Sequence, residues 1–157
     1  MTELKDSRLW ELLQQFQLTP HPEGGWYREV IRSDLTVERS DGHKRNAITG
    51  ILFLLSGSDK SRWHRVNHAD EVWIHLQGSA LNLWHLDPKS DELFKLKLDS
   101  ANPMQIIPAG CWQAACSEGA YTLVSCCVGP GFDFEDFEML RDTPKESWPK
   151  KALSELI

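Results

Sequence analysis

Residues 64–78, HRVNHADEVWIHLQG, carry three histidines, a glutamate and a tryptophan between two turn-like segments. Side chains alternate between the two faces of a strand, so the strand expected over 71–77 has one polar and one apolar face. The polar face carries Glu71, Trp73, His75 and Gln77, and the apolar face carries Val72, Ile74 and Leu76. The apolar face is suited to packing against a core or a partner subunit. The polar face either lines a pocket or meets solvent, and both interpretations stay open at this point.

Strand patterns continue on both sides of this stretch. Short apolar segments alternate with turn signals such as Asp41-Gly42 and Gly78, at a spacing typical of all-β sandwiches and barrels. No helix-length segment separates them, which argues against a parallel βαβ sheet. We expect about ten strands, near 25–32, 35–39, 46–55, 62–66, 71–77, 80–86, 93–98, 104–107, 112–116 and 121–128.

The two ends of the chain have different patterns. Apolar residues recur at helical spacing between Leu9 and Phe16, with Asp6 or Ser7 as a possible N-cap. The segment from 142 onwards is expected to form a loop and then a short helix. A chain of 157 residues with 41% apolar residues is typical of one globular domain, which we expect to span 1–157.

Composition argues against several classes of protein. The net charge is −6 and no basic stretch is long, so we expect no nucleic-acid partner. The longest apolar run, 51–55, is too short to cross a bilayer, and the charged start MTELKDSR lacks the apolar core of a secretory signal. The four cysteines form no CxxC pair. We therefore expect a reduced, cytoplasmic protein that does not contact the membrane.

The segment ITGILFLL, residues 48–55, is apolar on both faces of its expected strand. Strands of this kind are normally buried on both faces. If one of those faces were exposed, it would leave an apolar patch that monomers rarely tolerate. The pattern therefore predicts a homodimer.

Several motifs together resemble the cupin superfamily. His64, Glu71 and Gly78 match the first cupin motif, G-x5-H-x-H-x(3–4)-E-x6-G, while Pro108 and Gly110 match the second, G-x5-P-x-G-x2-H-x3-N. The segments HPEGGWYREV, WHRV, DEVW, IPAGCWQAA and GPGFDFEDFEML are similar to one branch, the cupin-5 family. With the helix expected at the N-terminus, the resemblance implies an all-β double-stranded β-helix, or cupin jelly roll, that usually forms a homodimer.

The chain departs from the usual cupin metal site, which consists of three histidines and a carboxylate. Val66 and Gln113 stand where the two motifs have histidine. Valine has no donor atom and glutamine offers only a weak amide oxygen, so we expect no metal cofactor. The alternative is a metal-dependent cupin in which His68 joins His64 and Glu71 as a ligand.

Without a metal, His64 and Glu71 indicate acid–base chemistry. A carboxylate beside an imidazole fixes its tautomer and raises its basicity, which suits a base that removes a proton from a carbon next to a carbonyl. The cupin-5 branch is similar to the epimerases of dTDP-linked deoxysugars, which use such a base without a metal and an acid on the opposite side. Here the acid could be Tyr27, Tyr121 or a protonated carboxyl group. Alternatively, His64 and Glu71 form a buried structural pair.

The residues expected to bind a ligand are Trp73, His75, Gln113, Tyr27 and Arg28. An indole stacks on sugar faces or nucleobases, and a guanidinium pairs with phosphate or carboxylate. Alternatively, the tryptophan fills the core and the arginine is a surface charge. The leading hypothesis is a metal-independent sugar or sugar-nucleotide epimerase or isomerase. The rival hypothesis is a non-catalytic cupin that binds carbohydrate or another small molecule.

Overall fold

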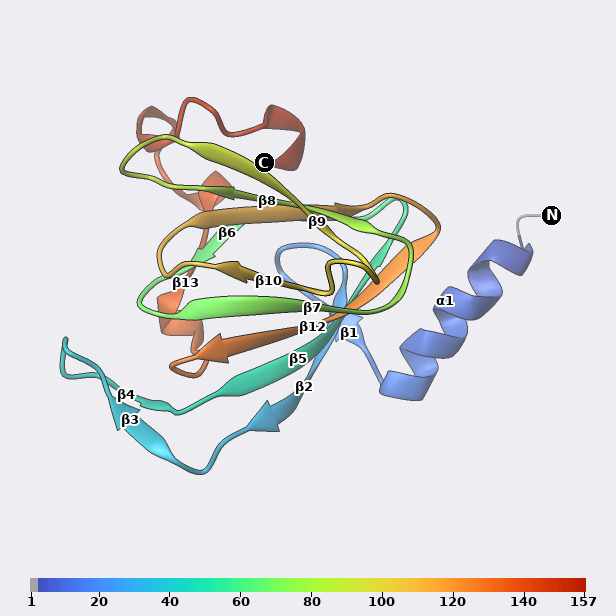
Figure 1. Ribbon diagram of the computed structural model, residues 1–157, viewed down its shortest axis with the longest axis horizontal. Coiled ribbons are helices and arrows are strands. Elements are labelled where there is room, and N and C mark those ends of the chain that lie inside the picture. Colours follow the sequence, from blue (N-terminus) through green and yellow to red (C-terminus); the bar gives the residue numbers. More distant parts are fainter. Residues whose placement is uncertain (1–2) are drawn as a thin grey trace.

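Two antiparallel sheets face each other in the computed structural model, which describes residues 3–157 (Figure 1). The six-stranded sheet has the order β1 (Thr19–Pro20), β2 (Trp26–Arg32), β5 (Thr49–Ser56), β12 (Tyr121–Gly129), β7 (Asp70–Gly78) and β10 (Met104–Ile107). The five-stranded sheet has the order β13 (Phe137–Met139), β6 (Lys60–Val66), β11 (Trp112–Ser117), β8 (Leu81–Leu86) and β9 (Leu93–Leu98). The chain crosses repeatedly between the sheets, so it forms the double-stranded β-helix that the resemblance to cupins implies.

The remaining elements lie outside these sheets. Helix α1 (Glu3–Phe16) packs on the outer face of the six-stranded sheet, and β3 (Thr36–Glu38) pairs with β4 (Lys44–Asn46) in a hairpin that projects from the body (Figure 1). Single 3₁₀ turns form at η1 (Phe134–Asp136), η2 (Leu140–Asp142), η3 (Lys145–Ser147) and η4 (Ser154–Leu156). Within the described part of the chain, no helix combines the length and apolarity needed to cross a membrane.

Each of the expected strand ranges contains a strand, but several boundaries differ from the prediction. The segment 46–55 is divided between β4 and β5, and β1 and β13 are too short to have a recognisable period. Helix α1 begins at Glu3, so Asp6 and Ser7 lie inside it rather than before it. The C-terminal segment forms 3₁₀ turns instead of the expected short helix. After Pro149 the chain closes a turn, with Ala152 N–H donating to the Pro149 carbonyl oxygen, and does not continue into a helix.

The main core lies between the two sheets. Phe53 of β5, Trp73 of β7, Leu83 of β8 and Val124 of β12 are all buried in it with at most 1% exposure. The opposite face of β5 turns outward, where Leu54 packs under helix α1. Part of the second apolar face of segment 48–55 is therefore covered by a helix of the same chain, an arrangement that strand periodicity does not reveal.

A second apolar cluster covers the outer face of the five-stranded sheet. Trp63 and Trp112 pack there against Leu140 and Leu156 of the C-terminal segment. Trp112 turns outward while its neighbour Gln113 turns inward, as strand alternation predicts. These two indoles fill a core rather than line a pocket.

Candidate functional site

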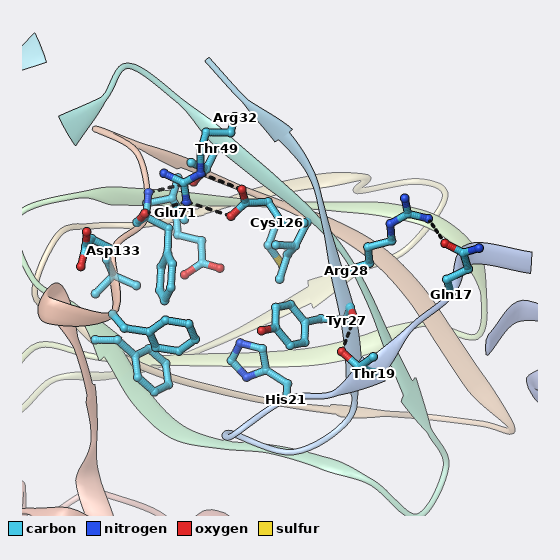
Figure 2. Close-up of a pocket in the computed structure, with 17 residues that line it drawn as sticks. Gln17, Thr19, His21, Tyr27, Arg28, Arg32, Thr49, Glu71, Cys126 and Asp133 are labelled. Atoms are coloured by element: carbon cyan, nitrogen blue, oxygen red, sulfur yellow. Dashed lines mark hydrogen bonds and ion pairs between the residues drawn. The ribbon is translucent and has the colours of Figure 1, made fainter. Parts of the chain in front are cut away.

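A cavity of about 540 Å³ opens between the six-stranded sheet and the segment that contains η1 and β13 (Figure 2). Strand β2 contributes Tyr27 to its wall, β7 contributes Glu71, and β12 contributes Cys126. His21, from the loop between β1 and β2, completes this part of the wall. Glu71 and Cys126 are buried in the fold, so a ligand that reached them would be shielded from bulk water.

The Glu71 carboxyl group is held by a chain of hydrogen bonds. Trp73 Nε1–H donates to Gln113 Oε1 at 2.7 Å, and Gln113 Nε2–H donates to Glu71 Oε2 at 2.6 Å. An indole N–H can only donate, so the glutamine amide can take only this orientation. The thiol of Cys126 also lies beside Glu71 and favours its charged form. Gln113 therefore orients the carboxyl group from behind, in the position where a cupin has a metal-binding histidine.

Burial dominates the acidity of Glu71. It raises the pKa of this carboxyl group to about 7, although the hydrogen bond from Gln113 and the neighbouring thiol of Cys126 oppose the change. Both the acid and the carboxylate are consequently present near neutral pH. A group in this state can take up and release a proton during a reaction.

His64 is paired with Glu23, and the predicted pairing with Glu71 is wrong. His64 Nδ1–H donates to the carbonyl oxygen of Arg62 at 2.7 Å, and Nε2 lies 3.0 Å from Glu23 Oε2. Burial lowers the pKa of His64 to about 4 and raises that of Glu23 well above its usual range. The neutral imidazole of His64 therefore accepts a hydrogen bond from the protonated carboxyl group of Glu23. Ser61 Oγ donates a hydrogen bond to the other Glu23 oxygen at 2.8 Å.

The physical reason for this pairing is which neighbour reaches each side chain. Glu71 on β7 is bonded by Gln113 of β11, which is the register partner of His64 on β6. Glu23 reaches His64 from the loop before β2, where its backbone carbonyl accepts a hydrogen bond from Arg62 N–H at 2.8 Å. His64 is only 1% exposed and is not part of the cavity wall. The catalytic role predicted for His64 stays a prediction, but the group that faces the cavity is Glu71.

His21 and Glu23 were not identified as site residues from the sequence. The backbone N–H of Glu23 donates to His21 Nδ1 at 3.2 Å, and Glu23 Oε2 lies 3.4 Å from the same nitrogen. The signal that could have found them is the pair of glycines that follows. A methyl group on Gly24 would overlap the carbonyl oxygen of Lys60, so only glycine lets this loop pack so closely under β6.

The rest of the cavity wall is aromatic on one side and polar at the rim. Phe132, Phe134 and Phe137 contact one another edge to face, with ring centroids 5.0 to 5.9 Å apart. At the rim, Arg32 donates to both carboxylate oxygens of Glu29, at 2.7 and 2.8 Å (Figure 2). The rim therefore presents a neutralised ion pair rather than a free cation.

The structure brings only some of the predicted ligand-binding residues to this cavity. Tyr27 lines the inner part, as expected for a pocket residue. Arg28 touches the cavity, but its guanidinium turns away and donates to Gln17 Oε1 at 3.0 Å, beyond the end of α1 (Figure 2). The reason is alternation along β2, which sends neighbouring side chains to opposite faces of the sheet.

Trp73, Gln113 and His75 do not line the cavity. Trp73 and Gln113 are 0% and 1% exposed and lie behind Glu71. His75 lies further along β7, with Nε2 3.2 Å from the carbonyl oxygen of Ser79. Trp73 and His75 lie on the same face of β7 as Glu71, as predicted, and Gln113 faces Glu71 from β11. That face extends from the cavity through the core to the next turn, so sharing it does not mean sharing the pocket.

The residues at the cupin metal positions do not fit a metal ion. Val66 has no donor atom, the Gln113 oxygen accepts from the Trp73 indole, and both nitrogens of His64 are already engaged. His68 cannot complete an alternative site, because it lies at φ 66° on a turn with its side chain 58% exposed and near Asp41. Within residues 3–157, no three histidine, cysteine or acidic side chains converge as metal ligands would. The predicted alternative set of His64, His68 and Glu71 is therefore not assembled.

Comparisons with known proteins agree with the fold and the motifs. The family model Cupin_5, described as "Cupin superfamily (DUF985)", matches residues 10–140. The uncharacterised yeast protein YML079W is 28% identical over 157 residues, covering 86% of this chain and 76% of its own. Among solved structures, a hypothetical protein from Leishmania major is 31% identical with a TM-score of 0.74, covering 84% of this chain and 85% of its own. Protein SO0799 from Shewanella oneidensis is 33% identical with a TM-score of 0.74, covering 83% and 82%.

Proposed function

Since the chain belongs to the Cupin_5 family of the cupin superfamily, a small-molecule fold, we propose that its cavity binds a carbohydrate-type carbonyl compound. In this proposal Glu71 moves a proton on and off the carbon next to the carbonyl, which is the chemistry of an epimerase or isomerase. The observation that carries the proposal is a carboxyl group on the cavity wall whose pKa burial raises to about 7. General acid–base catalysis is most effective when the pKa of the group lies near the operating pH.

The proton transfer needs no resident metal. The Glu71 carboxylate takes the proton from the α-carbon, the C–H electron pair forms a carbon–carbon double bond, and the carbonyl π electrons move to oxygen. The glutamic acid then returns the proton to the former carbonyl carbon while the α-hydroxyl proton moves to the former carbonyl oxygen, so the α-carbon becomes the new carbonyl carbon. Gln113 keeps the carboxyl group aimed into the cavity throughout, because its own amide is fixed by Trp73.

The cavity wall favours an uncharged ligand. The Arg32 guanidinium is neutralised by Glu29, and that of Arg28 turns toward Gln17. Arg32 is therefore already paired, and the Arg28 guanidinium lies away from the part of the cavity that holds Glu71. The aromatic wall that includes Phe132 and Phe137 offers apolar surface of the kind that packs against the C–H faces of a sugar ring. A free sugar consequently fits the cavity better than a sugar nucleotide.

Hydrogen exchange in deuterated water tests this function. The protein is incubated with a panel of aldoses and ketoses, and deuterium at the α-carbon is measured by NMR. Replacing Glu71 with glutamine, Glu71→Gln, should lower the exchange rate by roughly 10²- to 10⁴-fold. The control Glu138→Gln removes a carboxylate that pairs with Arg65 outside the cavity, and its exchange rate should be unchanged.

Two other results would replace this proposal. If His64→Gln abolishes exchange while Glu71→Gln retains it, the base is the histidine that the sequence predicts. If no sugar exchanges but some raise the melting temperature of the protein, the cavity belongs to a non-catalytic carbohydrate-binding cupin.

A further inference from the structure

His21 presents a hydrogen-bonding group to the same cavity as Glu71. Two backbone hydrogen bonds close the loop around it, from His21 N–H to Gly25 O and from Gly24 N–H to His21 O, each 3.0 Å. The side chain is 6% exposed, and its ring meets the edge of Tyr27 with centroids 4.4 Å apart. The imidazole is therefore held in one orientation at the cavity wall (Figure 2).

The contact at Nδ1 determines which ring nitrogen carries the proton. His21 Nδ1 accepts a hydrogen bond from the backbone N–H of Glu23 at 3.2 Å. A backbone amide can only donate, so Nδ1 holds the lone pair and the proton is on Nε2. Among the described residues, none accepts a hydrogen bond from His21 Nε2. The Nε2–H group is therefore available to a ligand in the cavity.

The surroundings keep this imidazole uncharged. Burial lowers the pKa of His21 to about 3, with a further contribution from His64. The titratable groups that face the ring are Glu23 in the same loop, His64 on β6 and Tyr27 on β2, and its other aromatic neighbours are Phe53 and Phe137. The acid proton of Glu23 is directed to His64, so Glu23 supplies no negative charge that would draw a second proton onto His21. A neutral imidazole is the form that polarises a carbonyl in enzymes that enolise their substrates.

From this geometry we infer that His21 donates its Nε2 proton in a hydrogen bond to the carbonyl oxygen of the ligand whose α-proton Glu71 removes. The inference deepens the proposed function and depends on it for the proton-transfer step. As the C–H proton passes to Glu71, negative charge develops on the carbonyl oxygen, and the hydrogen bond from His21 stabilises it without transferring a proton. The ligand class that this pair fits is an uncharged α-hydroxy aldehyde or ketone, whose enediolate places an oxygen on each reacting carbon.

The first test measures the tautomer without any ligand. The side-chain ¹⁵N NMR spectrum at pH 7 should contain a neutral Nε2–H imidazole that disappears in the His21→Gln variant. An Nδ1–H tautomer, or a charged imidazolium, would remove the donor from the cavity and overturn the inference.

The second test measures binding of glycolohydroxamate, an uncharged, planar mimic of an enediolate, by calorimetry. His21→Phe should weaken binding by roughly threefold to tenfold, because a hydrogen bond to the hydroxamate carbonyl oxygen is lost. His21→Gln retains a neutral donor and should bind with intermediate affinity. The control His43→Phe replaces a histidine whose side chain is 57% exposed on the hairpin, and its affinity should equal that of the unmodified protein.

The two proposals fail in different ways. If the unmodified protein does not bind glycolohydroxamate, or if His21→Phe binds it equally well, the role of His21 is overturned. If binding depends on His21 as expected but no sugar exchanges its α-proton, the donor is real and the proton transfer assigned to Glu71 is wrong.

Discussion

Burial acts in opposite directions on the pKa of Glu71 and on those of the histidines near it. The pKa of Glu71 is raised to about 7, so between the usual carboxyl value and pH 7 the folded protein binds more protons than the unfolded chain. Stability from this group is therefore present at low pH and is lost as the pH rises through 7. The pKa values of His21 and His64 are lowered to about 3 and about 4. The stability that these two histidines contribute is therefore present at neutral pH and is lost as the pH falls from 6.5 toward 4.

A comparison of variants isolates the contribution of Glu71 to stability. Because both histidines remain in Glu71→Gln, their contributions cancel when that variant is compared with the unmodified protein. The variant should gain about 2 kcal/mol of unfolding free energy relative to the unmodified protein between pH 5 and pH 8. Urea unfolding at half-unit pH intervals measures this difference, and Glu138→Gln serves as a control that should show no such trend. A difference that stays constant with pH would mean that the Glu71 pKa is not raised.

Sequence spacing predicted part of this site and missed the rest for a physical reason. Val66 and Gln113 were recognised as departures from the metal site because motif positions are local in the sequence. The partner of His64 could not be recognised, since Glu23 lies far earlier in the chain and reaches the histidine only through the folded loop. Burial sets the pKa of Glu71, and no spacing rule reports burial.

The loop between β1 and β2 gives a sharp test of backbone constraint. Gly24 has φ +111°, and an added methyl group would overlap the carbonyl oxygen of Lys60. Gly24→Ala should therefore lower the unfolding free energy by about 3 kcal/mol or more, because strain and steric overlap act together. Gly42 is the matched control, since it also has positive φ, +83°, but nothing lies within 4 Å of its added methyl group. Gly42→Ala should cost only about 1 kcal/mol.

Urea denaturation of the two alanine variants measures both losses. Equal losses would mean that φ alone sets the cost and that the close approach to Lys60 contributes nothing. Because the same loop carries His21 and Glu23, Gly24→Ala should also disturb the cavity, whereas Gly42→Ala should leave it intact.

Elements with several alternating residues were predictable, and short ones were not. Burial alternates over the first five residues of β7 and over the last six of β12, which is long enough for the period of a strand to stand out. β13 has three residues and is a strand only because it pairs with the edge of β6. The break between β4 and β5 is likewise set by pairing, since β4 turns away to form a hairpin with β3.

In the whole molecule, α1 covers only one end of the outer face of the six-stranded sheet. Leu54 and Leu123 lie under the helix. At the other end, register links Ile106 to Val72, Val72 to Cys127, Cys127 to Gly50 and Gly50 to Ile31. Directly paired residues share a face, so these residues form a row across five strands, which we call the open row. Gly50 within it is buried, and the isoleucines at its two ends are exposed.

The open row leads us to expect the homodimer that segment 48–55 predicts. Ile31 and Ile106 are 48% and 53% exposed, and Met104, beside Ile106 on β10, is 60% exposed. Contiguous apolar surface of this kind is characteristic of protein interfaces. The occupant we propose is a second copy of the chain, because a two-fold axis through the sheet would bring two identical apolar rows together.

Sedimentation at micromolar concentration should therefore give twice the 18.0 kDa chain mass. The double variant Met104→Lys, Ile106→Lys should sediment as a monomer, because burying two ammonium groups in an apolar interface is unfavourable. Both side chains are exposed in the single chain, so this variant should remain folded by circular dichroism. The control Phe94→Lys alters an apolar residue with 42% exposure on β9 of the other sheet, and it should remain a dimer. A monomeric unmodified protein, or a double variant that stays dimeric, would exclude the open row as the interface.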